Sequence, residues 1–128
     1  MTASGAELSR RVERIERGYE YLLAYAAQGR RDDIGSEARV TLQSIYDALD
    51  GLHLQAWQAL GTAPGSHYEI QPFLDAVERD ARTARGAIGL VLSRPTISSM
   101  LVDNLNASVH LRALLTDLFL LEQAVQES

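Results

Sequence analysis

Apolar residues recur along most of this chain at alternating spacings of three and four positions, which is the pattern of a helix with one buried face. We predict helices over about residues 6–28, 34–60, 72–92 and 96–126. Only residues 66–70 alternate apolar and polar side chains, and that stretch is too short to build a sheet. The pattern therefore predicts an all-α protein.

Glycine and proline mark the helix boundaries. Gly29 follows the first apolar stripe, Pro64 lies in a polar loop near the middle of the chain, and Pro72 fits the first turn of the third helix. Pro95 disfavours a helical conformation at the residue before it, so the fourth helix begins at about this point. The second stripe keeps its register through Gly51, which predicts one unbroken helix despite a cost of about 1 kcal/mol for the interior glycine.

The fourth helix is apolar on more than one side. One buried face comprises Leu111, Leu114, Leu118, Leu121 and Val125. Leu115, Phe119 and Leu120 widen this face beyond what one neighbouring helix can cover. The helix is therefore expected at the centre of a bundle or at an interface with another chain. Four amphipathic helices with mostly short connections predict an antiparallel up-down-up-down four-helix bundle that forms a single domain over residues 1–128.

Two surfaces are candidate interfaces. Leu115, Phe119 and Leu120 lie on the fourth helix, and Tyr21 and Tyr25 form a partly apolar second face on the first helix. Tyrosine is enriched where a surface is apolar yet wet at one end. An ordinary core contact is the alternative for the tyrosines. We expect a homodimer in which the face that carries Leu115 and Phe119 meets its symmetry mate.

Composition excludes several classes of protein. A net charge of −5 and a pI of about 5.1 argue against nucleic acid as a partner, because phosphate-backbone binding needs a basic face. The chain has no cysteine, so it has no disulfide and no thiolate-bound metal. No apolar run reaches the length of a membrane span, and the polar start at residues 1–7 has no signal-peptide core, so we expect a cytoplasmic protein with no membrane partner.

No motif assigns a catalytic chemistry. Glutamate stands three positions before none of the three histidines, which excludes the di-iron carboxylate pattern of helical bundles. Phosphate-binding glycine loops and the His-Glu-x-x-His zinc motif are also absent. Asp47, Asp50 and His53 recur at helical spacing as an incomplete metal site, but they lie opposite the apolar stripe and are interpreted as a solvated face. We expect no metal and no cofactor.

The fourth helix also carries polar residues at helical spacing. Asp103, Asn106 and His110 form a row that would suit acid–base chemistry or phosphotransfer, with a solvent-facing row as the plainer interpretation. Asn104 and Ser108 fall on the apolar seam, where a buried amide either fixes helix register or binds a polar group of a ligand.

Gly86 and Gly89 lie inside the third helix, where each is unfavourable relative to alanine. Close approach of another helix is the preferred explanation, and a gap that holds a ligand or a hinge in the helix are the alternatives.

These observations predict an acidic helical protein that acts by binding another protein, as an adaptor, regulator or export-type chaperone, rather than as an enzyme. The alternative is a bundle, and in one version an enzyme, that binds a small molecule or a metal. Its pocket would be formed by Asp103, Asn104, Ser108, His110, Gly86 and Gly89.

Overall fold

The computed structural model describes residues 3–60 and 68–127. The described part of the chain is all-α. Its helices are α1 (Ala3–Ala26), α2 (Ala38–Leu49), α3 (Leu52–Leu60), α4 (Gln71–Leu92), α5 (Ser99–Asn106) and α6 (Val109–Gln126). The loop predicted around Pro64 lies outside the described residues.

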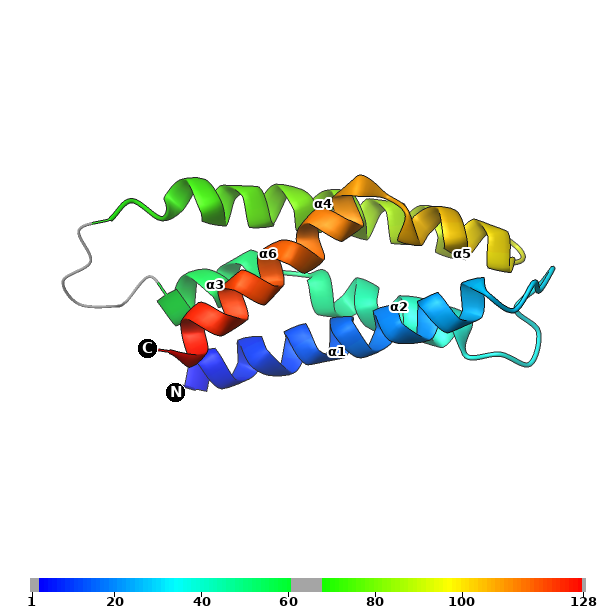
Figure 1. The fold of residues 1–128 in the computed structure, drawn as a ribbon, viewed down its shortest axis with the longest axis horizontal. Helices are drawn as coiled ribbons and strands as arrows, with labels where there is room; N and C mark the ends of the chain where they lie inside the picture. The colour runs from blue at the N-terminus through cyan, green and yellow to red at the C-terminus, as the bar shows by residue number, and fades with distance from the viewer. Residues whose placement is uncertain (1–2, 61–67, 128) are drawn as a thin grey trace.

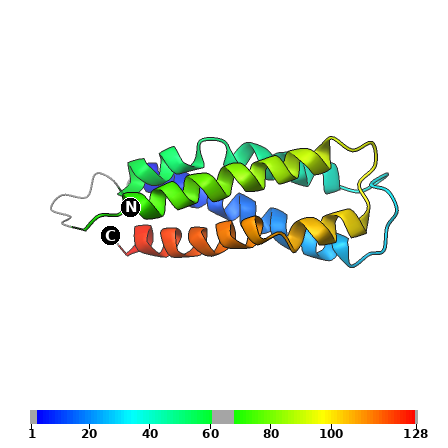
Figure 2. The same cartoon turned by 90° about the horizontal axis from the view of Figure 1, so that it is seen from above.

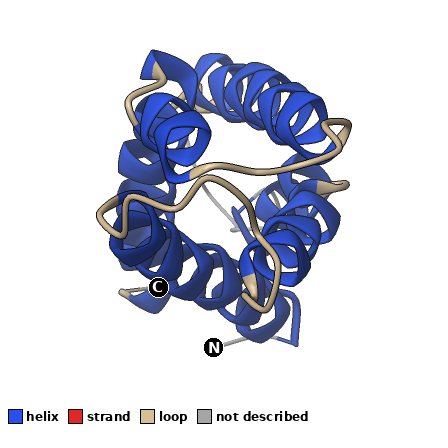
Figure 3. Cartoon of the chain, turned by 90° about the vertical axis from the view of Figure 1, so that its right-hand side faces the viewer, coloured by secondary structure: helices blue, strands red, loops and turns tan. Residues whose placement is uncertain are grey.

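The helices run back and forth along one long axis (Figures 1 and 2). The helix α1 leads away from the N-terminus, α2 and α3 return, α4 leads out again, and α5 and α6 return, so the two termini lie at the same end. Both α1 and α4 contact α2, α3, α5 and α6. The view down the long axis shows all helices arranged around a common interior (Figure 3).

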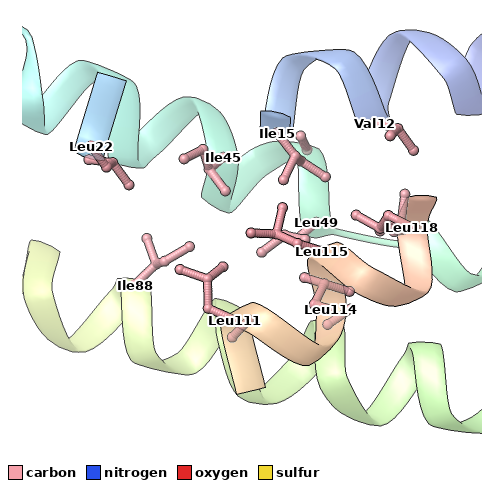
Figure 4. Packing of buried hydrophobic residues seen from close by; sticks show 14 of the residues in the cluster. Val12, Ile15, Leu22, Ile45, Leu49, Ile88, Leu111, Leu114, Leu115 and Leu118 are labelled. Carbon is pink, nitrogen blue, oxygen red and sulfur yellow. The ribbon is translucent and has the colours of Figure 1, made fainter. Parts of the chain in front are cut away.

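The interior is an apolar core to which most helices contribute. Side chains from α1, α2, α4 and α6 meet in its centre (Figure 4). The buried residues of α6 are Leu111, Leu114, Leu115, Leu118, Leu121 and Val125. These residues are buried because α6 packs against α1 and α4 and also touches α3 and α5. Of the residues that widen the apolar face, intrachain packing covers Leu115 and leaves Phe119 and Leu120 exposed.

The prediction of one unbroken helix over residues 34–60 is wrong, because two helices occupy this range. Helix α2 begins at Ala38 and ends at Leu49, Asp50 is extended, and Gly51 has a φ of +68° before α3 starts at Leu52. Glycine takes this left-handed conformation without the penalty that a Cβ atom imposes, so the residue ends a helix instead of interrupting one. The apolar register survives the break, since Leu49 and Leu52 are both buried.

The helix predicted over residues 96–126 is also divided. Helix α5 starts one residue after Ser98, whose Oγ accepts a hydrogen bond from the backbone N–H of Leu101 at 3.1 Å. It ends at Asn106, and Ser108 is extended ahead of α6. Serine competes for backbone hydrogen bonds and is poorly suited to a helix interior. The break changes which amide is buried: Asn106 is 6% exposed, whereas Asn104 is exposed.

Glycines inside helices mark two close approaches. A Cβ atom on Gly18 would lie 2.6 Å from Cδ1 and Cγ1 of Ile45, so α1 and α2 pack closely there. A Cβ atom on Gly89 would lie 3.4 Å from the ring of Tyr46. Gly86 is exposed and would meet nothing within 4 Å among the described residues. At Gly89 a neighbouring helix therefore approaches to the edge of ordinary van der Waals contact, whereas the predicted close approach is wrong for Gly86.

This difference leads to opposite expectations for two alanine substitutions. Gly86→Ala is expected to raise the free energy of unfolding by about 0.5–1 kcal/mol, because alanine favours the helix and has open space. Gly18→Ala is expected to lower it by about 1 kcal/mol, since crowding against buried Ile45 outweighs the same helix preference. Urea unfolding of both variants checks this, and shifts of the same sign would contradict the close packing at Gly18.

None of the helices in the described ranges is long and apolar enough to cross a membrane.

Candidate protein-binding surface

The side of α6 that faces away from the core carries two large apolar residues. Phe119 is 55% exposed and Leu120 is 61% exposed, although the residues on either side of the pair are buried. The exposed residues that share this side at helical spacing are Arg112, Thr116, Phe119, Leu120, Gln123 and Glu127. We call this set the α6 face. It is a solvated helix surface with an apolar centre.

Opposite charges flank the apolar centre at equal spacing. Arg112 precedes Phe119 by seven residues, and Glu127 follows Leu120 by seven residues. Each charge lies near the end of α6 whose dipole has the same sign, which is unfavourable. Among the described residues, neither side chain forms an ion pair within the chain. Glu127 accepts a hydrogen bond from Gln123 at 2.6 Å.

The other residues predicted for an interface are buried or half-buried. Leu115 is 5% exposed and Tyr25 is 0% exposed, so both belong to the core. Tyr21 is half-buried and stacks on the Tyr25 ring with a centroid distance of 6.2 Å. Phe119 and Leu120 are the exposed members of the predicted set.

The residues predicted for a ligand pocket are dispersed. Asp103 and Asn104 are exposed on α5, His110 is exposed on α6, and Ser108 is half-buried between these helices. The predicted polar row is not formed, because Asn106 turns inward and its Nδ2 donates to the carbonyl oxygen of Leu22 at 3.1 Å. Gly86 and Gly89 lie on α4.

The incomplete metal site proposed from the sequence is separated by the helix break. Asp47 belongs to α2, Asp50 follows its end, and His53 belongs to α3, where its Nε2 lies 3.8 Å from Oε1 of Glu78. Within the described residues, no three histidine, aspartate or glutamate side chains are grouped to hold a metal ion.

An apolar pocket opens beside the α6 face, at the end of the molecule where the termini lie. It has a volume of about 430 Å³. Its lining comes from α3, α4, α6 and the segment before α4, and consists of Leu60, Glu69, Ile70, Phe73, Leu120, Leu121 and Ala124. Leu120 therefore belongs both to this pocket and to the α6 face. An apolar concavity with few polar groups is typical of a site that receives an apolar side chain or ligand.

Carboxyl groups face each other along both sides of α6. Burial, together with the facing carboxyl of Asp80 on α4, raises the pKa of Asp117 to about 7. Burial, followed by the repulsion of Glu122, raises the pKa of Glu16 on α1. Asp117 Oδ2 is buried without a hydrogen-bond partner in the described structure. A proton shared between Asp80 and Asp117 would satisfy that oxygen and remove the repulsion.

Sequence reasoning missed the pairing of Asp117 with Asp80. Asp117 lies three residues after Leu114 and four before Leu121, so it stands at the edge of the buried stripe of α6. That position indicates from the sequence alone that Asp117 is partly buried, because a carboxyl beside a core seam is desolvated by the neighbouring helix. Its partner on α4 depends on how the two helices are aligned, which periodicity alone does not specify.

A polar network ties the loops together at the opposite end of the molecule. The Tyr25 hydroxyl donates to the carbonyl oxygen of Ile97 at 2.5 Å, and Ser99 Oγ donates to the Tyr25 carbonyl at 2.7 Å. Burial raises the pKa of the Tyr25 hydroxyl above its ordinary value of 10.0. The backbone N–H of Arg30 donates to Ser99 Oγ at 2.9 Å. These bonds fix the end of α1 to the segment that enters α5.

The same network contains a charged member. Asp33 accepts a hydrogen bond from the backbone N–H of Ile97 at 2.8 Å and another from Arg39 Nε at 3.2 Å. The bond from Ile97 is the main reason that the pKa of Asp33 is lowered. Arg39 Nη1 also donates to the carbonyl oxygen of Leu92 at 2.9 Å. The polar groups of this network form hydrogen bonds with one another, so we assign the network the structural role of holding these loops together.

Comparison with known proteins adds no identification, since no family model, no curated protein and no solved structure matches the chain.

Proposed function

We propose that this protein is a non-catalytic, cytoplasmic protein-binding module that forms a homodimer through the α6 face. In this proposal the fold is an up-down-up-down four-helix bundle, in which α2 with α3 and α5 with α6 each act as one bent arm. The observation that carries the proposal is the apolar pair Phe119 and Leu120, exposed between two opposite charges at equal distances.

This arrangement is self-complementary. In a two-fold symmetric dimer the same patch meets itself, and two copies of α6 centred between Phe119 and Leu120 would run antiparallel. Arg112 then lies at the level of the partner subunit's Glu127, and the pair occurs twice. Each charge also approaches the helix end of opposite sign in the partner, which offsets its unfavourable position in its own helix.

The helical geometry places these groups on one line of contact. At 3.6 residues per turn, Arg112 and Glu127 each lie within about 30° of the direction midway between Phe119 and Leu120. The apolar pair would supply a desolvated centre and the charges would supply a polar rim, as in interfaces that bind specifically. Rim charges contribute mostly to the choice of partner and orientation, so they decide between parallel and antiparallel pairing.

The dimer is tested by reversing the two charges separately and together. Arg112→Glu and Glu127→Arg each replace two attractive contacts by two repulsive ones, and each is expected to raise the dimer dissociation constant at least about tenfold. The double variant restores the pairs with exchanged signs and is expected to recover dimerisation. Sedimentation equilibrium over about 1 to 100 μM protein measures the constants and brackets the affinities of modest interfaces.

Two further variants complete this experiment. Phe119→Glu is expected to give a monomer, and Leu90→Glu is the matched control, since Leu90 is 65% exposed on α4 and lies outside the α6 face. Circular dichroism of each variant confirms that the helices remain. A parent protein that stays monomeric throughout, or a double variant no better than the single ones, would overturn the proposed interface.

A further inference from the structure

The seam between α4 and α6 leads from the apolar pocket to the carboxyl pair. Phe73 and Ala124 line the pocket, and Asp80 and Asp117 each lie seven residues away on the same two helices. The two helices run in opposite directions (Figure 2). Going forward from Phe73 to Asp80 on α4 and going backward from Ala124 to Asp117 on α6 therefore lead in the same direction along the molecule. Seven residues of helix span about 10.5 Å. An apolar site and an acidic site therefore follow each other along one seam.

The acidic site lacks a balancing cation. Asp80 and Asp117 face each other, and no arginine of the described residues forms an ion pair with either. Asp117 Oδ2 is buried and has no hydrogen-bond partner there. The repulsion between two facing carboxyls is relieved either by a proton or by a positive group from outside. Glu69 adds a third carboxyl at the pocket.

We call the surface that leads from the apolar pocket along the seam to Asp80 and Asp117 the α4/α6 groove, and we infer that it binds a basic amphipathic helix of a partner protein. An apolar side chain of that helix enters the pocket, and an arginine or lysine about seven residues along its sequence lies beside Asp80 and Asp117. The spacing agrees because a helix that lies along the groove rises by the same distance per residue as α4 itself. The pocket volume of about 430 Å³ leaves room for a large apolar side chain.

Charge selects this occupant over the other helices that an apolar pocket would accept. The chain carries a net charge of −5. The α4/α6 groove combines an apolar pocket with the carboxyls of Glu69, Asp80 and Asp117. An acidic helix would meet repulsion at each of them, and a purely apolar one would leave the carboxyl pair unrelieved. The inference goes beyond self-association: it shares Leu120 with the α6 face but does not use Arg112 or Glu127.

Two synthetic peptides test the groove. Each is about 18 residues long, so that it can form a helix, and has leucines at positions i and i+4 on an alanine and glutamine background. One carries arginine at i+7 and the other carries glutamate there. Isothermal titration calorimetry at pH 8, where the carboxyl of Asp117 is largely ionised, is expected to give at least about tenfold tighter binding of the arginine peptide.

Variants of the protein show whether the α4/α6 groove causes the preference for the arginine peptide. Asp117→Asn and Asp80→Asn are expected to remove most of the preference for arginine, whereas Asp75→Asn makes the same charge change on the exposed surface of α4 and is expected to leave it intact. Ala124→Glu introduces a charge at the pocket and is expected to weaken both peptides. Lowering the pH to 6 protonates most of the Asp117 carboxyl, whose pKa is about 7, and is expected to reduce the preference.

Failure of this inference is distinguishable from failure of the proposed dimer. The titrations are repeated on Arg112→Glu, whose groove is unchanged, so binding there is independent of self-association. Absence of binding, equal binding of the two peptides, or tighter binding of the glutamate peptide would overturn the inference. An unchanged arginine preference in Asp117→Asn would do so as well.

Discussion

Replacing Tyr25 by phenylalanine is expected to lower the free energy of unfolding by about 1–3 kcal/mol. The Tyr25 side chain is fully buried, and its hydroxyl donates to the carbonyl oxygen of Ile97 at 2.5 Å. Phenylalanine keeps the ring but leaves that buried carbonyl without its donor. The cost is that of an unsatisfied buried acceptor, which exceeds the net contribution of an average hydrogen bond.

The neighbouring tyrosine of the same helix is the control for this substitution. Tyr21 stacks on Tyr25, but its hydroxyl accepts a hydrogen bond from the exposed backbone N–H of Glu37 at 3.0 Å. Water replaces that bond easily, so Tyr21→Phe is expected to change stability by no more than about 0.5 kcal/mol. Urea unfolding of both variants measures the difference. Equal losses would show that the Tyr25 hydroxyl does not hold the two loops together.

The helical class and the composition of the core could be predicted from the sequence because both depend on local periodicity. The stripe that contains Leu111, Leu114 and Leu118 is buried as its spacing predicts. The breaks at Gly51 and Ser108 were missed for a related reason. Periodicity reports which side of a helix is buried, and two helices joined by a short break can keep the same buried side, as Leu49 and Leu52 do.

The candidate surface was predictable only in part. Phe119 and Leu120 are exposed as an interface requires, but Leu115 is buried because α6 packs against several helices of its own chain. The sequence shows that a face is apolar and does not show which neighbour covers it. Asn106 and Asn104 illustrate the same limit: the break at Ser108 changes the helix register, so the buried amide is two positions from the expected one.

The carboxyl pair was beyond sequence reasoning, because it depends on two helices far apart in the chain. Asp80 and Asp117 meet only through the alignment of α4 with α6. The second pair, Glu16 with Glu122, depends on the alignment of α1 with α6. Helix α6 is thus bordered on two sides by groups that repel each other when ionised, which links its packing to pH.

Asp117→Asn is therefore expected to stabilise the protein at pH 8 and to have a smaller effect at pH 5. The folded pKa of Asp117, about 7, lies above its ordinary value of 3.8, so the folded state binds the proton more strongly than the unfolded state. This contribution to stability is fully present below pH 3.8 and is lost progressively as the pH rises from 3.8 to 7. Because Asp117 keeps some solvent contact, screening limits the gain at pH 8 to about 1–2 kcal/mol.

Urea unfolding between pH 5 and pH 8 measures this effect. The parent protein is expected to lose stability across this range, and Asp117→Asn is expected to lose less, with the remaining slope due in part to Glu16, whose pKa is also raised. Asp103→Asn changes the charge equally at an exposed position of α5 and is expected to follow the parent curve. If the Asp117 and Asp103 variants show the same pH dependence, Asp117 does not face a second carboxyl across the α4/α6 seam.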